Sequence, residues 1–326
     1  MSRNHLFLPV LLLLAAASVL LALGTGSIAL SPWHVASVLL GGGDELSRSL
    51  VLELRMPRIL AGFAAGGLLG LAGALMQVLL RNPLADPYVL GVAGGAAVAA
   101  LLAMLAGLGG LWLTGSAFAG ALLSMFLVFG LAHGRGSWTA TRLLLTGVVI
   151  AGGWGALISF LLALAPDAQL RGMLFWLMGD LTYSSAPLAP LMVLAAAALG
   201  TLALARPLNV LTHGALQAQA LGVNVNRLQL VLYVLASLLT AFAVTTAGSV
   251  GFVGLIVPHI VRLLVGSDHR YVLPGAALLG GILLVLADTL ARTAFAPQQL
   301  PVGVVTALIG VPVFLFLLQR SAGPSR

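Results

Sequence analysis

The stretch MPRILAGFAAGGLLGLAGALMQVLL, residues Met56–Leu80, decides the fold class of this chain. From Ile59 onward it has no charged side chain, and a helix that crosses a bilayer needs about 20 mostly apolar residues. Gly62, Gly66 and Gly70 recur every four residues, a spacing that lets helix backbones approach closely and is also typical of generic tight packing. The stretch therefore predicts a membrane-spanning helix within a bundle.

The rest of the chain repeats this apolar pattern. Hydrophobic residues make up 60% of the 326 residues and charged residues only 7%, whereas a soluble domain carries about 25% charged residues. This excludes a water-soluble globule and predicts an all-α integral membrane protein in which residues 1–326 form a single transmembrane domain. About ten spans are expected: Leu6–Leu30, Met56–Leu80, Tyr88–Gly107, Leu111–Leu131, Leu143–Ala165, Leu188–Ala205, Leu228–Ala247, Val250–Val265, Leu273–Ala294 and Val302–Gln319.

Two of these spans are unusual. The first is long for the apolar core of a signal peptide and lacks a small-residue cleavage site, so we interpret it as a retained span. The eighth is short, and Pro258 and His259 interrupt it, so it is the least secure full crossing.

The basic residues indicate the orientation in the membrane. All 15 are arginine. An N-terminus on the inner side places ten of them inside and five outside, which agrees with the positive-inside rule and predicts that both termini are cytoplasmic. The inner set is Arg3, Arg81, Arg135, Arg142, Arg206, Arg227, Arg262, Arg270, Arg320 and Arg326, and the outer set is Arg48, Arg55, Arg58, Arg171 and Arg292.

The same rule assigns the longer polar connections to the two sides of the membrane. Ser31–Arg55 and Pro166–Pro187 are predicted to face outward, and Arg206–Arg227 inward. Ala168–Gly179 fits a short helix on the outer surface, with Trp176 as an interfacial anchor. On the inner side, Ala215–Leu221 fits either a short helix that stops at Gly222 or a plain loop.

The residue types required by several kinds of chemistry are missing. Without lysine, the chain lacks the phosphate-binding loop G-x-x-x-x-G-K-[ST]. Without cysteine, it has no disulfide or thiolate nucleophile. The chain contains neither H-E-x-x-H nor G-x-S-x-G, so we expect no catalytic residue. The six histidines do not cluster at ligand spacing, so we expect no metal site and no cofactor bound by this chain. The arginines are scattered singly, which argues against nucleic acid as a partner.

Other classes of membrane protein are alternatives at this point. An ion-driven secondary transporter would place an acid near the middle of the bilayer, and only Asp288 could serve. Asp288 and Arg292 are four residues apart, and they form either an ion pair or part of a docking surface for a partner. An intramembrane enzyme would need a catalytic pair within the spans, which the sequence lacks.

Several long motifs occur in one order along the chain: LRMPRILAGFAAGGLLGLAGALMQ (Leu54–Gln77), RNPLADPYVLGVAGGAA (Arg81–Ala97), TRLLLTGV (Thr141–Val148), FWLMGDL (Phe175–Leu181), GFVGLIVPHIVRLLVGSDHRYVLPG (Gly251–Gly275), LADTLAR (Leu286–Arg292) and LPVGVVTALIGVPVF (Leu300–Phe314). With these motifs the chain resembles the iron-chelate and cobalamin permeases of bacterial ABC importers, the FecCD/BtuC type, over nearly its whole length.

The resemblance implies a fold and an assembly. The expected fold is the type II ABC importer permease fold, in the bacterial inner membrane. The expected assembly is a homodimer with two ABC ATPase subunits, which bind ATP and Mg, and a periplasmic substrate-binding protein. The substrate would be a large metal chelate: cobalamin first, then a ferric siderophore, then haem. The permease itself would catalyse no reaction.

The resemblance also implies roles for particular residues. Three residues match the family's arginines that dock the binding protein: Arg55, Arg58 and Arg292. Eight residues match the family's segment that couples to the ATPase: His213, Gly214, Leu216, Gln217, Gln219, Ala220, Leu221 and Gly222. Six residues match the family's cytoplasmic gate: Asn82, Pro83, Leu84, Ala85, Asp86 and Thr141. Ala140 stands where the family usually has a hydroxyl residue and Gln299 where it usually has Glu, so neither receives a role.

Overall fold

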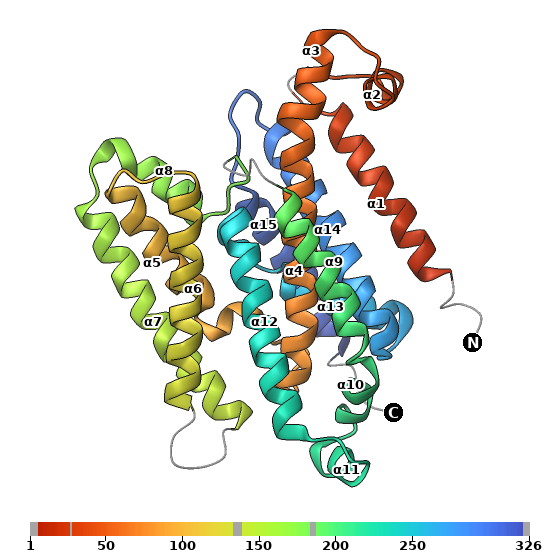
Figure 1. The fold of residues 1–326 in the computed structure, drawn as a ribbon, viewed down its shortest axis with the longest axis vertical. Helices are drawn as coiled ribbons and strands as arrows, with labels where there is room; N and C mark the ends of the chain where they lie inside the picture. The colour runs from red at the N-terminus through yellow and green to blue at the C-terminus, as the bar shows by residue number, and fades with distance from the viewer. Residues whose placement is uncertain (1–5, 27, 133–138, 183–186, 322–326) are drawn as a thin grey trace.

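The computed structural model describes residues 6–26, 28–132, 139–182 and 187–321, and these ranges are helical without a β-strand. Three arginines of the predicted inner set, Arg3, Arg135 and Arg326, lie outside the described residues, as does the side chain of Arg320. Figure 1 shows a bundle of long helices that run between two ends of the molecule, with shorter helices capping both ends.

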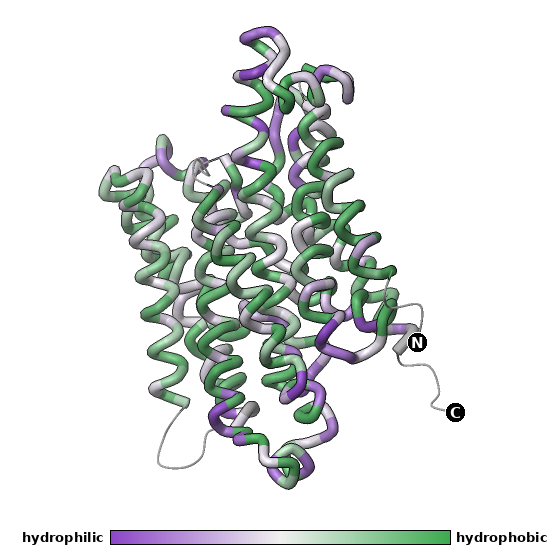
Figure 2. Tube along the Cα trace, turned by 45° about the vertical axis from the view of Figure 1, so that its right-hand side comes forward, coloured by the Kyte–Doolittle hydropathy of each residue, from purple (hydrophilic) through white to green (hydrophobic). Residues whose placement is uncertain are grey.

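Each of the ten predicted spans contains one apolar helix. These helices are α1 (Phe7–Gly24), α4 (Met56–Leu79), α5 (Val92–Leu105), α6 (Leu111–Ala132), α7 (Ala140–Leu164), α9 (Leu188–Leu202), α12 (Val225–Ala247), α13 (Val253–Val265), α14 (His269–Thr293) and α15 (Val302–Ser321). Figure 2 shows apolar residues along the sides of the bundle and hydrophilic residues gathered toward its two ends.

The helices differ in their capacity to cross a bilayer. Within the described residues, six are long and apolar enough: α1, α6, α7, α12, α14 and the continuous helical stretch Glu45–Leu79, which includes α4. The bent pair α9 and α10 (Ala205–Leu211), at 59°, could form a seventh. Helices α5 and α13 have 14 and 13 residues. At 1.5 Å per residue each reaches only about 20 Å, less than the ~30 Å hydrocarbon core.

The third predicted span illustrates why such a helix is short. Pro87 opens η2, a single 3₁₀ turn over Pro87–Leu90, and Gly91 follows with a left-handed φ of 70°. The 3₁₀ turn and the left-handed residue interrupt the α-helical hydrogen bonds, so the regular helix begins only at Val92. An apolar run therefore set the position of the helix but not where it begins.

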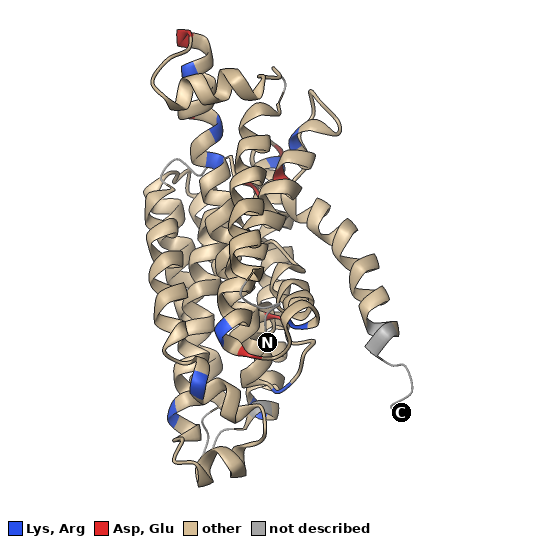
Figure 3. Cartoon of the chain, turned by 90° about the vertical axis from the view of Figure 1, so that its right-hand side faces the viewer, with Lys and Arg blue, Asp and Glu red and all other residues tan. Residues whose placement is uncertain are grey.

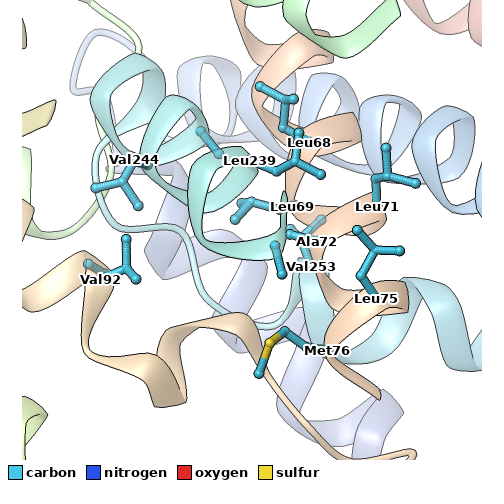
Figure 4. Packing of buried hydrophobic residues seen from close by; sticks show 14 of the residues in the cluster. Leu68, Leu69, Leu71, Ala72, Leu75, Met76, Val92, Leu239, Val244 and Val253 are labelled. Carbon is cyan, nitrogen blue, oxygen red and sulfur yellow. The ribbon is translucent and has the colours of Figure 1, made fainter. Parts of the chain in front are cut away.

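Helix α4 lies at the centre of the bundle. In its most apolar stretch of 18 residues 89% of the residues are buried, whereas the corresponding share for the peripheral helix α7 is 11%. In Figure 4, leucines of α4 such as Leu69 and Leu75 pack in one cluster with Val92 of α5, Leu239 of α12 and Val253 of α13. The stretch that decided the fold class is thus also the helix around which the core forms.

The glycine stripe of α4 permits close contacts between helix backbones. A Cβ atom added at Gly66 would collide with the carbonyl oxygen of Gly280 in α14, and one added at Gly73 with that of Gly254 in α13. Gly70 approaches the carbonyl of Ala276 in the same way. The stripe therefore serves tight packing, one of the two interpretations open from the sequence.

The short helices divide between the two ends as the charge pattern predicted. Helices α2 (Pro32–Leu39), α3 (Glu45–Arg48) and α8 (Asp167–Leu177) lie at one end, and α10 and α11 (Ala215–Ala220) at the other (Figure 1). The π-helical segment η1 (Ser49–Arg55) leads from α3 into α4. We name these the outer and inner ends, following the predicted orientation.

The outer-surface helix exists, but the role expected of its tryptophan is wrong. Trp176 is only 5% exposed and packs within the hydrophobic core, so it is not an interfacial anchor. Because α8 presses one face against the bundle, the indole fills core space that composition alone could not reveal. At the inner end the helix alternative for Ala215–Leu221 is confirmed by α11, followed by Gly222 at φ 81°.

Candidate functional site

A buried carboxylate connects two of the three candidate docking arginines at the outer end. Asp288 of α14 has a side chain only 3% exposed. Arg58 of α4 binds it through Nε at 3.2 and 3.1 Å and through Nη2 at 2.8 Å. Arg292, one turn along α14, donates from Nε to Asp288 Oδ2 at 3.0 Å. The ion-pair interpretation of Asp288 and Arg292 is therefore confirmed, and Arg58 completes it.

This cluster extends to the neighbouring connections. Arg58 Nη1 donates to Thr182 Oγ1 at 3.3 Å and to Gln299 Oε1 at 3.2 Å. Arg292 Nη2 is buried and has no hydrogen-bond partner within the described structure. Two guanidinium groups thus share one carboxylate, and the cluster keeps a net positive charge. Figure 3 shows basic and acidic residues together in this part of the molecule.

Arg55 has a different environment. It is 6% exposed, and its guanidinium donates to the backbone carbonyl of Leu23 in the last turn of α1 (2.6 Å) and to that of Ile28, beyond the end of α1. The last carbonyls of a helix have no partners within it, so this arginine satisfies one of them and joins α1 to the start of α4. Gly26 allows the approach, because a Cβ there would collide with the Arg55 guanidinium.

The candidate gate begins with a compact turn after α4. Arg81 has a left-handed φ of 49°, and Asn82 Oδ1 accepts from the Leu84 N–H at 2.9 Å. Asp86 Oδ1 accepts from the Tyr88 N–H at 2.7 Å and so caps η2. The Asn82-Pro83 and Asp86-Pro87 dipeptides therefore lie in a fixed turn.

The remaining candidate gate residue, Thr141, lies on a different element. It is exposed in the first turn of α7, which Thr139 caps by accepting from the Arg142 N–H at 3.2 Å. Helix η2 packs against α7 further along, where a Cβ at Gly147 would collide with the Val89 carbonyl oxygen. The Asn82–Asp86 turn thus leads directly into an element that contacts α7, the helix that carries Thr141.

The candidate ATPase-coupling segment forms a projecting hairpin of short helices. Gly214 at φ 119° separates α10 from α11, and Gly222 at φ 81° ends α11, conformations that favour glycine. Ala218 is buried beneath the hairpin, whereas Leu216 is 83% exposed and Leu221 is 72% exposed. Large apolar side chains exposed at a polar end of a membrane protein are typical of a surface that a partner covers.

A further polar cluster lies at the inner end and is not predicted by the sequence motifs. Gln77 of α4 accepts from Arg262 Nη1 and donates to the Leu255 carbonyl at 3.0 Å. Nearby, Asn209 of α10 holds both Asp268 and His269. A signal did exist, since Gln77 is the single amide within the uncharged run of α4 and Arg262 lies within an apolar span.

Asp268, at the start of α14, is an ionised carboxylate whose Oδ1 accepts two hydrogen bonds. Burial acts to raise the pKa of Asp268, but hydrogen bonds from the Arg270 N–H and the Asn209 amide outweigh it and hold the pKa below its ordinary value. Over the part of the chain that the structure describes, no group of three or more His, Cys, Asp or Glu side chains could hold a metal ion.

Comparison with known proteins identifies relatives along almost the whole chain. The sequence profile of the FecCD transport family matches residues 12–320. A cobalamin import system permease protein, BtuC, of Halobacterium salinarum is 44% identical over 299 residues, covering 88% of this chain and 79% of that protein. A hemin transport system permease protein, HmuU, of Yersinia pestis is 40% identical over 317 residues, covering 93% and 92%.

A solved structure has the same fold. It is an inward-facing conformation of a metal-chelate type ABC transporter, and it matches with a TM-score of 0.85 and 31% sequence identity. The match covers 96% of this chain and 98% of that chain.

Proposed function

The chain belongs to the FecCD transport family, and we propose that the substrate it carries is cobalamin. It is a multi-pass membrane permease of an ABC importer for metal chelates and not an enzyme. The observation that carries the choice is the 44% identity to a cobalamin permease. A relative named for hemin is 40% identical, so haem, together with a ferric siderophore, is the competing substrate.

ATP-dependent uptake into proteoliposomes tests this choice. The liposomes would contain the permease and its ATPase, with the binding protein added on the outer side, and labelled cobalamin, ferric siderophore and haem would be offered separately. We expect uptake of cobalamin only when all three proteins and ATP are present. Uptake of haem or siderophore, with none of cobalamin, would replace the substrate but keep the importer function.

We propose that the binding protein docks on the outer end at Arg55, Arg58 and Arg292. The support is the charge excess there, because Arg58 and Arg292 share the single carboxylate of Asp288. A cationic patch favours an acidic partner surface and gives a salt-sensitive association.

The docking proposal is tested by charge reversal. Changing Arg55, Arg58 and Arg292 to Glu should weaken binding-protein affinity at least tenfold at low salt, measured by surface plasmon resonance. Arg171→Glu on α8, an exposed outer-end arginine beside the ring of Phe175, is the control and should bind normally. Size-exclusion profiles would confirm that each variant is folded. Unchanged affinity of the triple variant at low salt would refute the proposal.

We propose that the permease forms a homodimer and that α10 and α11 of each copy bind one of two ABC ATPase subunits at the inner end. In this arrangement both termini are cytoplasmic. The exposed Leu216 and Leu221 support this contact. We propose further that the Asn82–Asp86 turn and Thr141 form the cytoplasmic gate, which the fixed geometry of the turn supports. Because the chain has no cysteine, Leu84→Cys would allow a bulky thiol reagent to be placed at the gate alone, and it should block uptake.

A further inference from the structure

A cavity of about 380 Å³ lies at the inner end, between the end of α4, the end of α10 and the junction of α13 and α14. Arg81, Arg262, His213 and His269 line it together with hydroxyl and amide groups, and none of its described lining residues is acidic. The cavity wall therefore carries a net positive charge. Such a wall favours an anionic occupant.

Arg262 brings a permanent charge without a matching anion. Its Nη1 donates to Gln77 Oε1, and Gln77 is fixed in turn by its bond to the Leu255 carbonyl at 3.0 Å. An amide oxygen accepts a hydrogen bond but does not neutralise the guanidinium. Within the described structure the ion pairs lie at the outer end, and none involves Arg262. A partly buried cation in this condition is stabilised by binding an anion.

The hydrogen bonds around His269 determine its tautomer. Asn209 Oδ1 accepts from the backbone N–H of His269 at 2.8 Å, while Asn209 Nδ2 donates to Asp268 Oδ1 at 2.7 Å. Nδ1 of His269 lies 2.7 Å from Asn209 Oδ1, which can only accept, so Nδ1 must carry the hydrogen. In the neutral ring Nε2 then has only a lone pair. His269 is 1% exposed, and Nε2 is buried without a hydrogen-bond partner among the described residues.

We propose that this cavity binds a phosphate-class oxyanion that carries a hydrogen, such as hydrogen phosphate or a protonated phosphomonoester head group. Its unprotonated oxygens accept from the guanidinium groups of Arg262 and Arg81, and its P–OH donates to His269 Nε2. Sulfate has no such hydrogen at neutral pH, so the site discriminates against it. Asn82 and Pro83 belong to the same cavity wall, so an occupant contacts the turn after α4.

Calorimetric titration of the full-length permease in detergent at pH 7.5 tests the proposal. Inorganic phosphate should bind, and sulfate at matched ionic strength should bind at least tenfold more weakly. Arg262→Gln should weaken phosphate binding at least tenfold. Arg81→Asn should do the same, and asparagine tolerates the left-handed backbone at that position. Arg206→Gln, which removes an exposed inner-end charge outside the cavity, is the control and should bind normally.

A second arm distinguishes free phosphate from lipid. The thermal midpoint of the permease would be measured in phosphatidylcholine nanodiscs with and without phosphatidic acid, near pH 6.5 and without phosphate buffer. A shift lost in Arg262→Gln assigns a lipid head group, whereas a response to inorganic phosphate alone assigns the free anion. The absence of both responses, or sulfate binding equal to phosphate, would overturn the proposal. Neither arm depends on the transported chelate or on the ATPase.

Discussion

At the scale of single residues, Asp288 is the most constrained charge in the described structure. It accepts from two guanidinium groups and is almost fully buried, so its carboxylate is compensated on both sides. An uncompensated charge in such a place costs several kcal/mol. The same residue was the one acid that could have served an ion-driven transporter, and its two arginine partners instead make it part of a fixed cluster.

Asp288→Asn should therefore destabilise the permease strongly. The substitution keeps the shape but leaves Arg58 and Arg292 without their shared anion, and we expect a loss of about 3 kcal/mol. The measurement is the thermal midpoint of the purified protein in detergent. Asp44→Asn is the matched control: Asp44 is exposed and caps α3, and asparagine caps a helix about equally well. Equal midpoints for both variants would contradict this account of the cluster.

A second residue-scale prediction concerns Leu216. If its exposed side chain contacts the ATPase, Leu216→Asp should reduce co-purification of the ATPase with the permease at least tenfold, because a carboxylate would be buried at the contact. Leu40→Asp changes an equally exposed leucine at the outer end and should leave the complex intact. Full retention of the ATPase by Leu216→Asp would argue against coupling through α11.

At the scale of elements, the helices pack closely because glycine, which has no side chain, occupies the contact positions. Helix α4 meets α13 and α14 through glycines whose neighbours are backbone carbonyls, and a backbone cannot yield as a flexible side chain can. Apolar surface gives little driving force between helices in lipid, so this close approach is what holds the core together.

A methyl group at this contact should separate α4 from α13. Gly73→Ala would place Cβ against the Gly254 carbonyl, and we expect a loss of about 1–3 kcal/mol in stability, measured as a lower thermal midpoint. Gly115→Ala on α6 meets open space and should keep or raise the midpoint, since alanine favours a helix. A Gly73→Ala midpoint as high as that of Gly115→Ala would be inconsistent with backbone contact.

At the scale of the whole molecule, one face of the bundle lacks a partner within the chain. Helix α7 is the least buried of the six long spans, and Gly152, Gly153 and Gly155 on it have open space where a Cβ would be. Lipid requires only apolar residues on a helix surface, whereas glycines favour contact with another helix. We therefore expect α7 to contact the second copy in the proposed homodimer.

Cysteine cross-linking in membranes tests this interface without background, because the chain has no cysteine. Gly153→Cys and Ala156→Cys, one turn apart on the exposed part of α7, should give covalent dimers on oxidation. Leu13→Cys on α1 is as exposed to the surroundings but should remain monomeric on denaturing gels. Dimers from Leu13→Cys alone would move the interface to α1.

Composition and hydropathy pattern were enough to predict the all-α membrane fold class, the approximate positions of the ten apolar helices and the end of the molecule at which each long polar connection lies. Transfer of a residue into a bilayer and the placement of arginine depend on local composition, so a linear reading suffices for them. The candidate site residues were likewise found by motif, and the structure brings Arg58 and Arg292 onto one carboxylate, with Arg55 three residues before Arg58.

Which of these residues contact each other depends on the folded chain and cannot be inferred from local pattern. Arg58 and Asp288 are 230 residues apart, and Gln77 and Arg262 are 185 apart, so no local pattern could pair them. The same holds for the buried Trp176, since its burial depends on how α8 packs against its neighbours. Hydropathy measures how favourable it is, in free energy, for a segment to leave water. It does not indicate which neighbouring groups will form hydrogen bonds with the polar atoms of that segment.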